Sequence, residues 1–377
     1  MKNVCSVDAS ARAFYPLPTL FASETMSEET DNVQLCIIGA GVAGVGIADA
    51  LSESAIDVTF IEKSRGVGGR AATRRKNGCR YEHGANYIKN DPAGNIKQLI
   101  ESLGEGGLVD IDEPIWTFDA DGDIQESDRQ EDHKWTWKQG ITQFSKRILA
   151  RTHATVEQPV RAQSLNQANG RWTVTDTDDA EYGPFDAVVF TPPAPQTATL
   201  LAETTVGGEE DDRLVAAHSA VEGVSYRSVR TFILHYPFTI DRDYYAVVNR
   251  DKAHSIGWLA RESCKDDHVP EGEELLVVQM GNDWSEAHYD EPREELAPVA
   301  AEMVAELLDD DALTEPDWVD EQGWRYAQPE DSVTMDAIEP LVEIGLYAAG
   351  DWVVGHGRAH KAYWNGVELG EQLSATL

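Results

Sequence analysis

Short, nearly continuous apolar runs occur near residues 33, 57, 185 and 344, and glycine, proline or charged residues follow each of them. Such runs are typical of parallel strands buried on both faces. They predict strands over 33–38, 57–62, 185–190 and 344–349. From about residue 200 the pattern changes to spaced, alternating strands. These predict a half-exposed antiparallel sheet over 231–236, 244–248, 255–259 and 274–279.

Apolar residues at helical spacing predict helices between these strands. The helices cover 42–53, 95–103, 140–149 and 294–308, and a last one runs through Ala362, Trp364 and Val367 to Leu373. Strands over 155–157 and 159–161 and a hairpin over 171–179 complete the middle of the chain. Strands that alternate with helices indicate an α/β fold, and the stretch after residue 200 indicates a second sheet.

One turn has two interpretations. The aspartate series over 119–123 follows a predicted strand over 115–118, which is compatible with a calcium loop or a hairpin turn. A calcium loop of the EF-hand type needs Gly at its sixth position and Glu at its twelfth. Those positions hold Ile124 and Gln130. A hairpin turn is therefore expected.

The first strand leads into the glycine motif GAGVAG over 39–44, which opens the helix at residue 42. A dinucleotide pyrophosphate needs this arrangement. Gly39 allows a sharp turn, Gly41 lets the backbone approach the phosphates, and Gly44 allows close helix–strand packing. The helix N-terminus adds free N–H donors and a positive dipole end. The motif therefore predicts a dinucleotide site.

An acid ends the second strand. Glu62 can accept hydrogen bonds from both hydroxyls of an adenosine ribose, and its charge disfavours a 2′-phosphate, so the ligand should be FAD or NAD rather than NADP. A second glycine turn, at Gly68 and Gly69, then leads into the basic stretch RAATRR over 70–75. We expect these arginines near the pyrophosphate.

The last apolar strand ends in Gly350 and Asp351, and a glycine-rich turn at Gly355 and Gly357 follows before the C-terminal helix. This order puts Asp351 at the carboxyl edge of the sheet, where it can accept a ribityl hydroxyl of a flavin. The helix start can face the flavin pyrimidine carbonyl, which gains negative charge on reduction. His356 and His360 allow a metal interpretation, but the pattern offers no third ligand, so helix histidines without a metal are expected.

The formal net charge is −36, from 67 acidic and 31 basic residues. Such a surface repels nucleic acid and anionic membranes, so neither is an expected partner. Screening in a salty cytoplasm would remove the self-repulsion. We therefore interpret the acidic clusters over 209–212 and 309–311 as solvated faces of a salt-adapted, halophile-type protein.

The sequence contains no run of 18 apolar residues, which is the length that would be needed to span a membrane. The four cysteines, Cys5, Cys36, Cys79 and Cys264, lack C-x-x-C spacing, which indicates a reduced, cytoplasmic protein. The first 25 residues have no long apolar core, and Met26 shortly precedes the first strand. We expect residues 1–30 to be a disordered extension with no part in the fold.

From about Val33 to the C-terminus the sequence resembles the renalase-like branch of the FAD-dependent amine oxidase superfamily. The stretches that carry the resemblance are GAGVAG at 39–44, Glu62, GGR at 68–70, EHGA at 82–85, the helix at Gly140, 185–193, GWLA at 257–260 with Lys265, WRYA at 324–327 and AGDW at 349–352. Asn86 stands where the family commonly has Gln, facing the flavin edge. No cysteine lies in the C-terminal motif, so FAD is expected to be non-covalent.

The resemblance implies a Rossmann-type, glutathione-reductase-like FAD-binding domain over 33–88, 138–200 and 325–377. A discontinuous α+β substrate domain on an antiparallel or mixed sheet would cover 89–137 and 201–324. Renalases oxidise isomeric forms of reduced nicotinamide dinucleotides, passing a hydride to flavin N5 and then electrons to O2, with H2O2 as product. This chemistry needs no catalytic triad, because a dihydropyridine is already a hydride donor.

The site residues follow from the motifs and the resemblance together. We expect His83, Asn86, Trp258 and Trp324 at the reacting ring, although a histidine such as His83 can equally be satisfied by backbone. The residues expected to bind FAD are Gly39, Gly41, Ala43, Gly44, Glu62, Lys63, Gly69, Arg70, Gly84, Ala85, Asn86, Val160, Gly350, Asp351, Arg358 and Ala359, and no metal is predicted.

The expected function is that of an FAD-dependent oxidase. It would take a hydride from a reduced pyridine nucleotide or an amine-like donor, use O2 as acceptor and work as a monomer or homodimer. One alternative is a flavin amine oxidase or a carotenoid or lipid desaturase, and a desaturase would require a long apolar tunnel. Another is an FAD-binding, redox-responsive protein that no small donor reduces.

Overall fold

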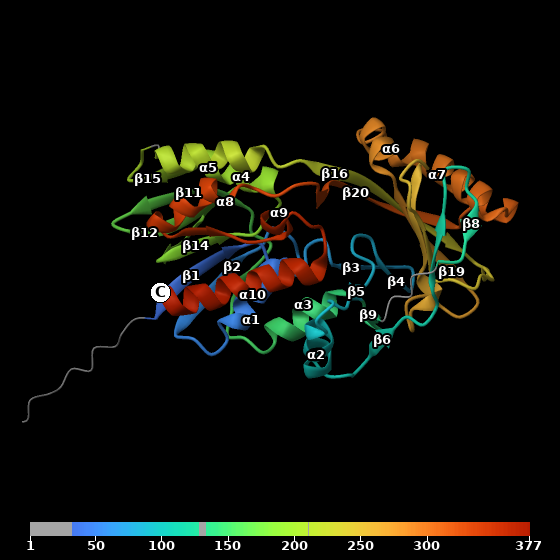
Figure 1. The fold of residues 1–377 in the computed structure, drawn as a ribbon, viewed down its shortest axis with the longest axis horizontal. Helices are drawn as coiled ribbons and strands as arrows, with labels where there is room; N and C mark the ends of the chain where they lie inside the picture. Colours follow the sequence, from blue (N-terminus) through green and yellow to red (C-terminus); the bar gives the residue numbers. More distant parts are fainter. Residues whose placement is uncertain (1–31, 128–132, 210) are drawn as a thin grey trace, which may run out of the picture. The chain divides into compact units, whose positions relative to one another are not determined.

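The apolar runs form a five-stranded parallel sheet in a computed structural model that describes residues 32–127, 133–209 and 211–377 (Figure 1). The extension predicted over residues 1–30 lies outside the described residues. The strands, in their order across the sheet, are β10 (Thr155–Glu157), β2 (Ile56–Ile61), β1 (Val33–Ile38), β14 (Ala187–Phe190) and β21 (Leu346–Ala348). Every neighbouring pair is parallel, as predicted.

Two helices with glycines at their contact cover one face of this sheet. They are α1 (Val42–Ala50), shorter than predicted, and α10 (Ala359–Thr376). A Cβ on Gly46 would lie 2.3 Å from the Tyr363 carbonyl oxygen, and one on Gly366 would lie 2.0 Å from that of Ala43. The two backbones therefore touch, which only glycine allows. Within the described parts of the chain, no helix is long and apolar enough to cross a membrane.

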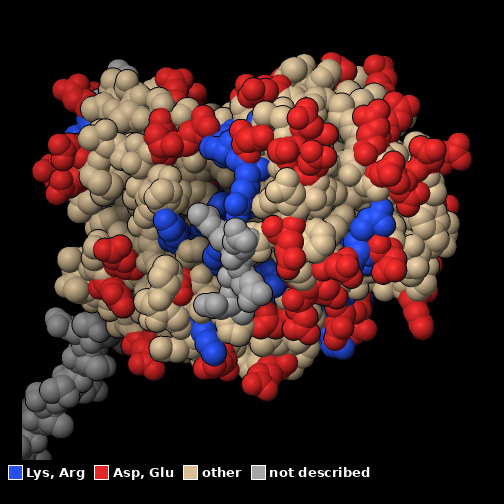
Figure 2. Space-filling model, turned by 45° about the vertical axis from the view of Figure 1, so that its right-hand side comes forward, with Lys and Arg blue, Asp and Glu red and all other residues tan. Residues whose placement is uncertain are grey.

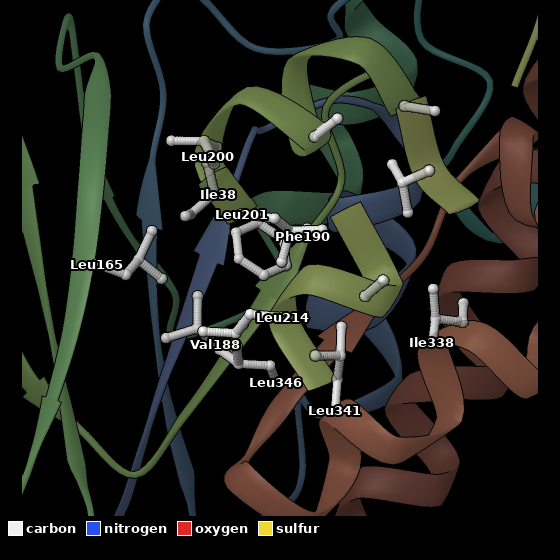
Figure 3. Packing of buried hydrophobic residues seen from close by; sticks show 14 of the residues in the cluster. Ile38, Leu165, Val188, Phe190, Leu200, Leu201, Leu214, Ile338, Leu341 and Leu346 are labelled. Carbon is white, nitrogen blue, oxygen red and sulfur yellow. The ribbon is translucent and has the colours of Figure 1, made fainter. Parts of the chain in front are cut away.

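A second sheet and several helices cover the opposite face. Ile38, Val188 and Phe190 of the parallel sheet pack against Leu165 and Leu214 (Figure 3). The covering elements are β13 (Glu181–Phe185), β12 (Arg171–Asp176), β11 (Ala162–Ala168), β15 (Thr204–Val206), α4 (Ala194–Ala202), α5 (Asp212–Glu222), α8 (Met335–Ile338) and a 3-10 turn at Glu339–Ile344. The apolar pattern does not predict α4 and α5, because small and polar residues dominate both.

The predicted strand over 159–161 is wrong, and the hairpin over 171–179 is confirmed. No strand lies between Glu157 and Ala162. The intervening Val160 instead donates its N–H to the carbonyl of Glu62, at 2.8 Å. The segment therefore continues along the end of β2 without joining a ladder.

A seven-stranded mixed sheet contains the strands predicted after residue 200. Its order is β20 (Trp318–Pro329), β16 (Tyr226–Tyr236), β19 (Glu274–Met280), β18 (Ile256–Arg261), β17 (Ala246–Asn249), β7 (Ile115–Phe118) and β8 (Ile124–Gln125). β17 and β7 are parallel and the other pairs antiparallel. The β7–β8 hairpin confirms the turn over 119–123. The polar sequence of β20 hides it from the apolar pattern.

The prediction of a half-exposed sheet is wrong for its central strands. β16 and β19 are buried on both faces. α7 (Arg293–Leu308) packs on one face through Leu296, and the hairpin of β3 (Thr73–Lys76) and β4 (Cys79–Glu82) packs on the other through Tyr81. A short hairpin far away in sequence, mostly polar but contributing Cys79 and Tyr81, covers the second face.

The remaining elements surround these layers. They are β5 (Ile88–Lys89), β9 (Lys134–Trp137) and β6 (Leu108–Asp110) in a three-stranded sheet, α2 (Asn95–Ser102), α3 (Thr142–Leu149), α6 (Asn282–Ala287), α9 (Asp351–Val354) and 3-10 turns at Glu262–Cys264 and Asp311–Thr314. Helices α2, α3 and α7 lie close to their predicted bounds.

Candidate functional site

The carboxyl ends of four parallel strands bring Gly39, Glu62, Thr191 and Gly350 to one edge of the sheet. Ligands bind at this edge in open parallel sheets, because loops and helix N-termini meet there. Thr191 Oγ1 lies 2.8 Å from the carbonyl oxygens of Ile38 and Gly39. We call this region the glycine edge.

The three glycines of the first motif serve different purposes. Gly39 has a φ of +98°, and a Cβ on Gly44 would lie 2.5 Å from the Gly39 carbonyl oxygen, so turn and packing require both. Gly41 has an ordinary φ of −74°. A Cβ there would meet no atom of the described chain within 4 Å. Nothing in the described structure accounts for Gly41, whereas a pyrophosphate that approaches the backbone would.

Glu62 is held beside this turn. The residue is only 5% exposed, and its carboxylate accepts hydrogen bonds from the N–H groups of Ala40 (2.8 Å) and Ser64 (2.6 Å). Each carboxylate oxygen keeps a second lone pair, so ribose hydroxyls can still donate to it. The Val160 N–H contact with the Glu62 carbonyl places Val160 next to Glu62, as the predicted site requires.

Lys63 lies on the same side. Its Nζ donates to Gln196 Oε1 at 3.1 Å. Burial, and then the nearby charge of Arg161, hold the pKa of Lys63 below its usual range.

The second glycine turn packs on the first and delivers Arg70. Gly68 donates to the carbonyl of Ala40 at 2.8 Å, which places the two turns side by side. The Arg70 guanidinium pairs with Asp351 Oδ1 at 2.8 Å and also donates to the carbonyls of Tyr326 and Ala327 in β20. Arg70 thus joins Asp351, at the glycine edge, to β20 of the seven-stranded sheet. Both Arg70 and Asp351 are predicted site residues.

A segment over 82–86, which we call the donor segment, carries two of the four residues predicted at the reacting ring, His83 and Asn86. The carbonyl of His83 accepts a hydrogen bond from Trp324 Nε1 at 2.7 Å, and the two rings stack with centroids 5.4 Å apart. Burial, assisted by the charge of Arg74, lowers the pKa of His83 to about 4. His83 is therefore a neutral imidazole at physiological pH, and its buried Nδ1 lacks a hydrogen-bond partner among the described residues.

Asn86 and Trp258 lie farther along the same region. Asn86 Nδ2 donates to the Gly84 carbonyl at 3.2 Å, and Gln279 Nε2 donates to the same oxygen at 2.7 Å. Gln279 on β19 faces Trp258 on β18, whose ring lies 6.4 Å from that of Tyr87. Asn86 Oδ1 and Trp258 Nε1 are buried, and neither has a hydrogen-bond partner within the described ranges. Such buried polar atoms cost stability unless a ligand or water meets them.

The packing gives Gly84 and Ala43 roles inside the protein. A Cβ on Gly84 would lie 2.1 Å from the Arg70 carbonyl oxygen, and Ala85 N–H donates to that oxygen at 2.9 Å. The Ala43 carbonyl lies against Gly366 of α10. Glycine is therefore needed at 84 for contact with Arg70, whatever else approaches it.

The predicted residues Arg358 and Ala359 lie at the start of α10. Burial lowers the pKa of His360; the charge of Asp91 opposes this shift, and the charges of Lys361, Arg358 and Lys89 add to it, so all four charged groups lie near His360. We call Lys89, Arg358 and Lys361 the basic group. Figure 2 shows Lys and Arg side chains gathered at a hollow on a face that Asp and Glu otherwise dominate.

The motifs alone miss three residues of this region. Thr191 bonds the first glycine turn, Asn365 Oδ1 accepts the Gly350 N–H at 2.8 Å, and Gln279 bonds the donor segment. Gln279 carried a signal, because it is the single polar side chain within the apolar run 275–280. Asn365 had none, since an asparagine in a long helix is common.

The two parts of the site differ in chemistry. The glycine edge offers backbone N–H groups, a carboxylate and an arginine to an elongated anionic molecule. The donor segment and its neighbours offer a neutral imidazole, unpartnered amide and indole atoms and aromatic faces. None of the four residues predicted at the reacting ring is an activated nucleophile. These residues, His83, Asn86, Trp258 and Trp324, can instead orient a flat polar ring and form hydrogen bonds with it.

Two family models match the chain. The model of the NAD(P)-binding Rossmann-like domain matches residues 37–103, and that of the flavin containing amine oxidoreductases matches residues 96–368. The second match covers most of the chain and includes the seven-stranded sheet, Trp258, Trp324 and the start of α10.

Solved structures share the fold at low sequence identity. A protein from Exiguobacterium sp. 255-15 provisionally assigned as a protoporphyrinogen oxidase has a TM-score of 0.71 at 15% identity, covering 92% of this chain and 99% of that one. A reduced UDP-galactopyranose mutase gives 0.71 at 12%, covering 92% and 94%. Putrescine oxidase bound to putrescine gives 0.66 at 14%, covering 91% and 99%.

Proposed function

Because the chain belongs to the family of flavin-containing amine oxidoreductases, we propose that it takes its hydride from a reduced nicotinamide dinucleotide, as renalases do, rather than from an amine. The protein is an FAD-dependent oxidoreductase that acts on a small molecule and uses O2. When bound, FAD supplies the redox chemistry, accepting a hydride and passing the electrons to O2 to give H2O2. The protein supplies binding, orientation and exclusion of water.

The glycine edge would hold the cofactor without a covalent bond. Gly41 and the start of α1 would receive the pyrophosphate, Glu62 the adenosine ribose and Asp351 the ribityl chain. The bare backbone at Gly41 supports this arrangement. The sequence has no cysteine between Cys264 and its C-terminus, so a thioether at the C-terminal motif is not available.

The proposed choice of donor rests on the positive charge of the basic group. An amine substrate is a cation at neutral pH, whereas a dinucleotide carries a pyrophosphate. On a protein of net charge −36, Lys89, Arg358 and Lys361 gather near His360 at the start of α10. Asp91 also lies near His360, but three cations against one carboxylate leave a positive charge there, which would repel an ammonium and attract a phosphate.

The uncharged lining of the donor segment supports the same choice. A dihydronicotinamide needs only to be held with its ring oriented, because it is already a hydride donor. His83 stays neutral and Asn86 Oδ1 lacks a partner in the described structure, so both can bond a carboxamide without a proton transfer. An amine would also need to lose a proton before oxidation.

We also propose the two-domain division, with a glutathione-reductase-like FAD domain over 33–88, 138–200 and 325–377 and a substrate domain over 89–137 and 201–324. The parallel sheet, with a sheet on one face and helices on the other, supports the first assignment. Three of these boundaries fall inside elements: residue 88 lies in β5, residue 200 in α4 and residue 325 in β20.

Peroxide formation tests the donor. The wild-type protein, loaded with FAD, is given dihydronicotinamide dinucleotide isomers, a phosphate-free N-alkyl dihydronicotinamide and a panel of amines. We expect a dinucleotide isomer to be the best donor. The double variant R358Q/K361Q should raise the KM of that dinucleotide about tenfold and leave the KM of the phosphate-free donor unchanged, since two cations are lost.

The control variant is R293Q, which removes an exposed cation at the start of α7 that pairs with Glu294. It should change neither KM, which separates a local effect from the change in net charge. Efficient turnover of an amine, with no dihydronicotinamide isomer turned over, would overturn the proposed donor.

A further inference from the structure

Four ionisable side chains form a cluster that is closed to solvent beneath the donor segment. Glu82 from β4, Glu262 and Lys265 after β18, and His268 are all 0–1% exposed. Removing charges from water costs several kcal/mol per ion, and such clusters often stabilise no more than apolar packing would. A buried charge cluster next to a functional segment therefore calls for a role beyond stability.

The ammonium of Lys265 uses all of its donors. Its Nζ lies 2.5 Å from Glu82 Oε2, 2.6 Å from Glu262 Oε1 and 3.0 Å from the backbone oxygen of Asn86. An ammonium has three N–H donors, so none remains for another contact. Glu82, Glu262 and His268 have the spacing of metal ligands, but Lys265 Nζ already supplies the cation there.

His268 and Glu262 share one proton. His268 Nε2 lies 3.0 Å from the Trp137 carbonyl, which can only accept, and Nδ1 lies 3.2 Å from Glu262 Oε2. Burial alone would lower the pKa of His268, but Glu82 and Glu262 more than offset it and raise that pKa. Burial raises the pKa of Glu262, whereas Lys265 and His268 outweigh burial at Glu82 and bring its pKa to about 2. With that shared proton, the cluster is neutral overall.

The contacts of this cluster fix both ends of the donor segment. At the first end, Glu82 Oε1 accepts the Ile141 N–H at 2.9 Å, where α3 begins. At the other end, Lys265 holds the Asn86 carbonyl, and the same ammonium holds Glu82. His83 lies between these two anchors. Asn86, whose Oδ1 has no hydrogen-bond partner in the described structure, is itself the second anchor. Glu262 contacts Lys265 and His268, and its carboxyl group also lies within hydrogen-bonding reach of the Glu82 carboxylate.

We propose that Lys265 is a positioning residue, which clamps the donor segment at Glu82 and at Asn86 and so fixes where His83 and Asn86 present their polar atoms. Glu262 supports the clamp as the second carboxylate that Lys265 contacts. The role of Lys265 holds for any donor that reaches this segment, so it goes beyond the proposed choice of substrate.

The test compares K265M with E262Q. Met keeps the length of the side chain and loses all three donated hydrogen bonds. The glutamine introduced by E262Q can still accept from Lys265 and can donate to a neutral His268, so both contacts of Lys265 with the segment survive. Both variants disturb the same buried cluster, which makes E262Q the matched control for general destabilisation.

The first readout needs no cofactor. The Ala85 N–H donates to Arg70, and its hydrogen exchange in the apo protein reports how firmly the segment is held. K265M should speed this exchange about tenfold or more, as loss of a hydrogen bond to a charged group allows, and E262Q should leave it within about twofold. Equal exchange in the two variants would overturn the clamp.

The second readout uses the FAD-loaded protein under anaerobic conditions. K265M should lower the limiting rate of flavin reduction about tenfold or more while the Kd of the donor changes less than about threefold, because orientation is lost and binding is not. E262Q should keep both values. If K265M does not fold, K265Q, which can still donate to Asn86, should fold and show a smaller loss, and failure of both to fold would assign Lys265 to stability alone. Exchange in the apo protein keeps this test separate from the identity of the donor.

Discussion

The glycine edge and the donor segment hold their residues by different means. At the glycine edge most contacts involve a backbone group, as when the Glu62 carboxylate accepts the N–H of Ala40 and Thr191 Oγ1 donates to the Gly39 carbonyl. At the donor segment they are side-chain contacts that reach across the chain, from Trp324 to His83 and from Lys265 to Glu82. The first region depends on glycines, which have no side chain and so leave the backbone accessible. The second depends on contacts between buried side chains.

The difference decides what each region can do. Backbone donors and a carboxylate suit an invariant ligand such as a dinucleotide cofactor, whose shape does not change between relatives. Side chains collected from β18, β19 and β20 can change one at a time. The donor segment is therefore where family members of one fold would diverge in substrate.

The largest expected effect separates the two neighbouring glycines of the first motif. Gly41→Ala should leave the melting temperature unchanged and weaken FAD binding about 100-fold or more, because its Cβ meets only the space proposed for the pyrophosphate. Gly44→Ala should lower the free energy of unfolding by about 2 kcal/mol, because its Cβ lies 2.5 Å from a carbonyl oxygen. Fluorescence titration of apo protein with FAD and urea unfolding measure the two effects. A Gly41→Ala protein that binds FAD normally would show that FAD binding does not need the absence of a side chain at residue 41.

The second prediction concerns the neutral imidazole of the donor segment. The pKa of folded His83, about 4, is below that of an unfolded histidine, so the unfolded state takes up a proton first as pH falls. Stability should therefore be lost from about pH 6.5 downward, amounting to about 2 kcal/mol between pH 7 and pH 5. His83→Gln should lose that much less over the same range in urea unfolding. Parallel curves for the two proteins would show that His83 is not held neutral.

A smaller effect is expected where the two regions meet. Asp351→Ala removes the carboxylate proposed for the ribityl chain and the partner of Arg70, so FAD affinity should fall about tenfold. The control Asp331→Ala removes a carboxylate that bonds Ser225 instead. Flavin content after gel filtration gives the comparison. Full flavin content in Asp351→Ala would place the ribityl contact elsewhere.

The smallest effect should come from Trp324→Phe. Phe keeps an aromatic face against His83 and loses only the Nε1 hydrogen bond to its carbonyl. The loss should be about 1 kcal/mol in unfolding free energy, with a change of a few fold in the limiting rate of flavin reduction. Trp324→Leu, which also removes the aromatic stacking, is the natural comparison. Equal effects of the two variants would mean that stacking contributes nothing.

The sequence predicted the glycine edge because its physics is local. The run 33–38, the motif 39–44 and Glu62 lie within one strand–helix–strand unit, so spacing alone implies their arrangement. The donor segment was predicted only as a set of residue types. Its partner Gln279 lies in an apolar strand, and the pairing of Lys265 with Glu82 depends on how the β3–β4 hairpin packs on the seven-stranded sheet.

The errors have the same origin. The sheet after residue 200 was expected to be half exposed, because its alternation is visible in sequence and the hairpin that covers it is not. β20 was missed because its backbone pairs with β16 and its polar side chains Asp320 and Gln322 meet Arg74, and these contacts are formed only in the folded chain. Tertiary contacts of this kind override a local pattern.

Anaerobic flavin absorbance tests the central claim most directly. The FAD-loaded wild-type protein, in high salt, is mixed in turn with NADH, its dihydro isomers and a panel of amines. The account predicts fast bleaching near about 450 nm, where oxidised flavin absorbs, by one dihydronicotinamide isomer, with H2O2 formed when air is admitted. Bleaching by an amine alone, or bound flavin that no donor bleaches, would contradict it.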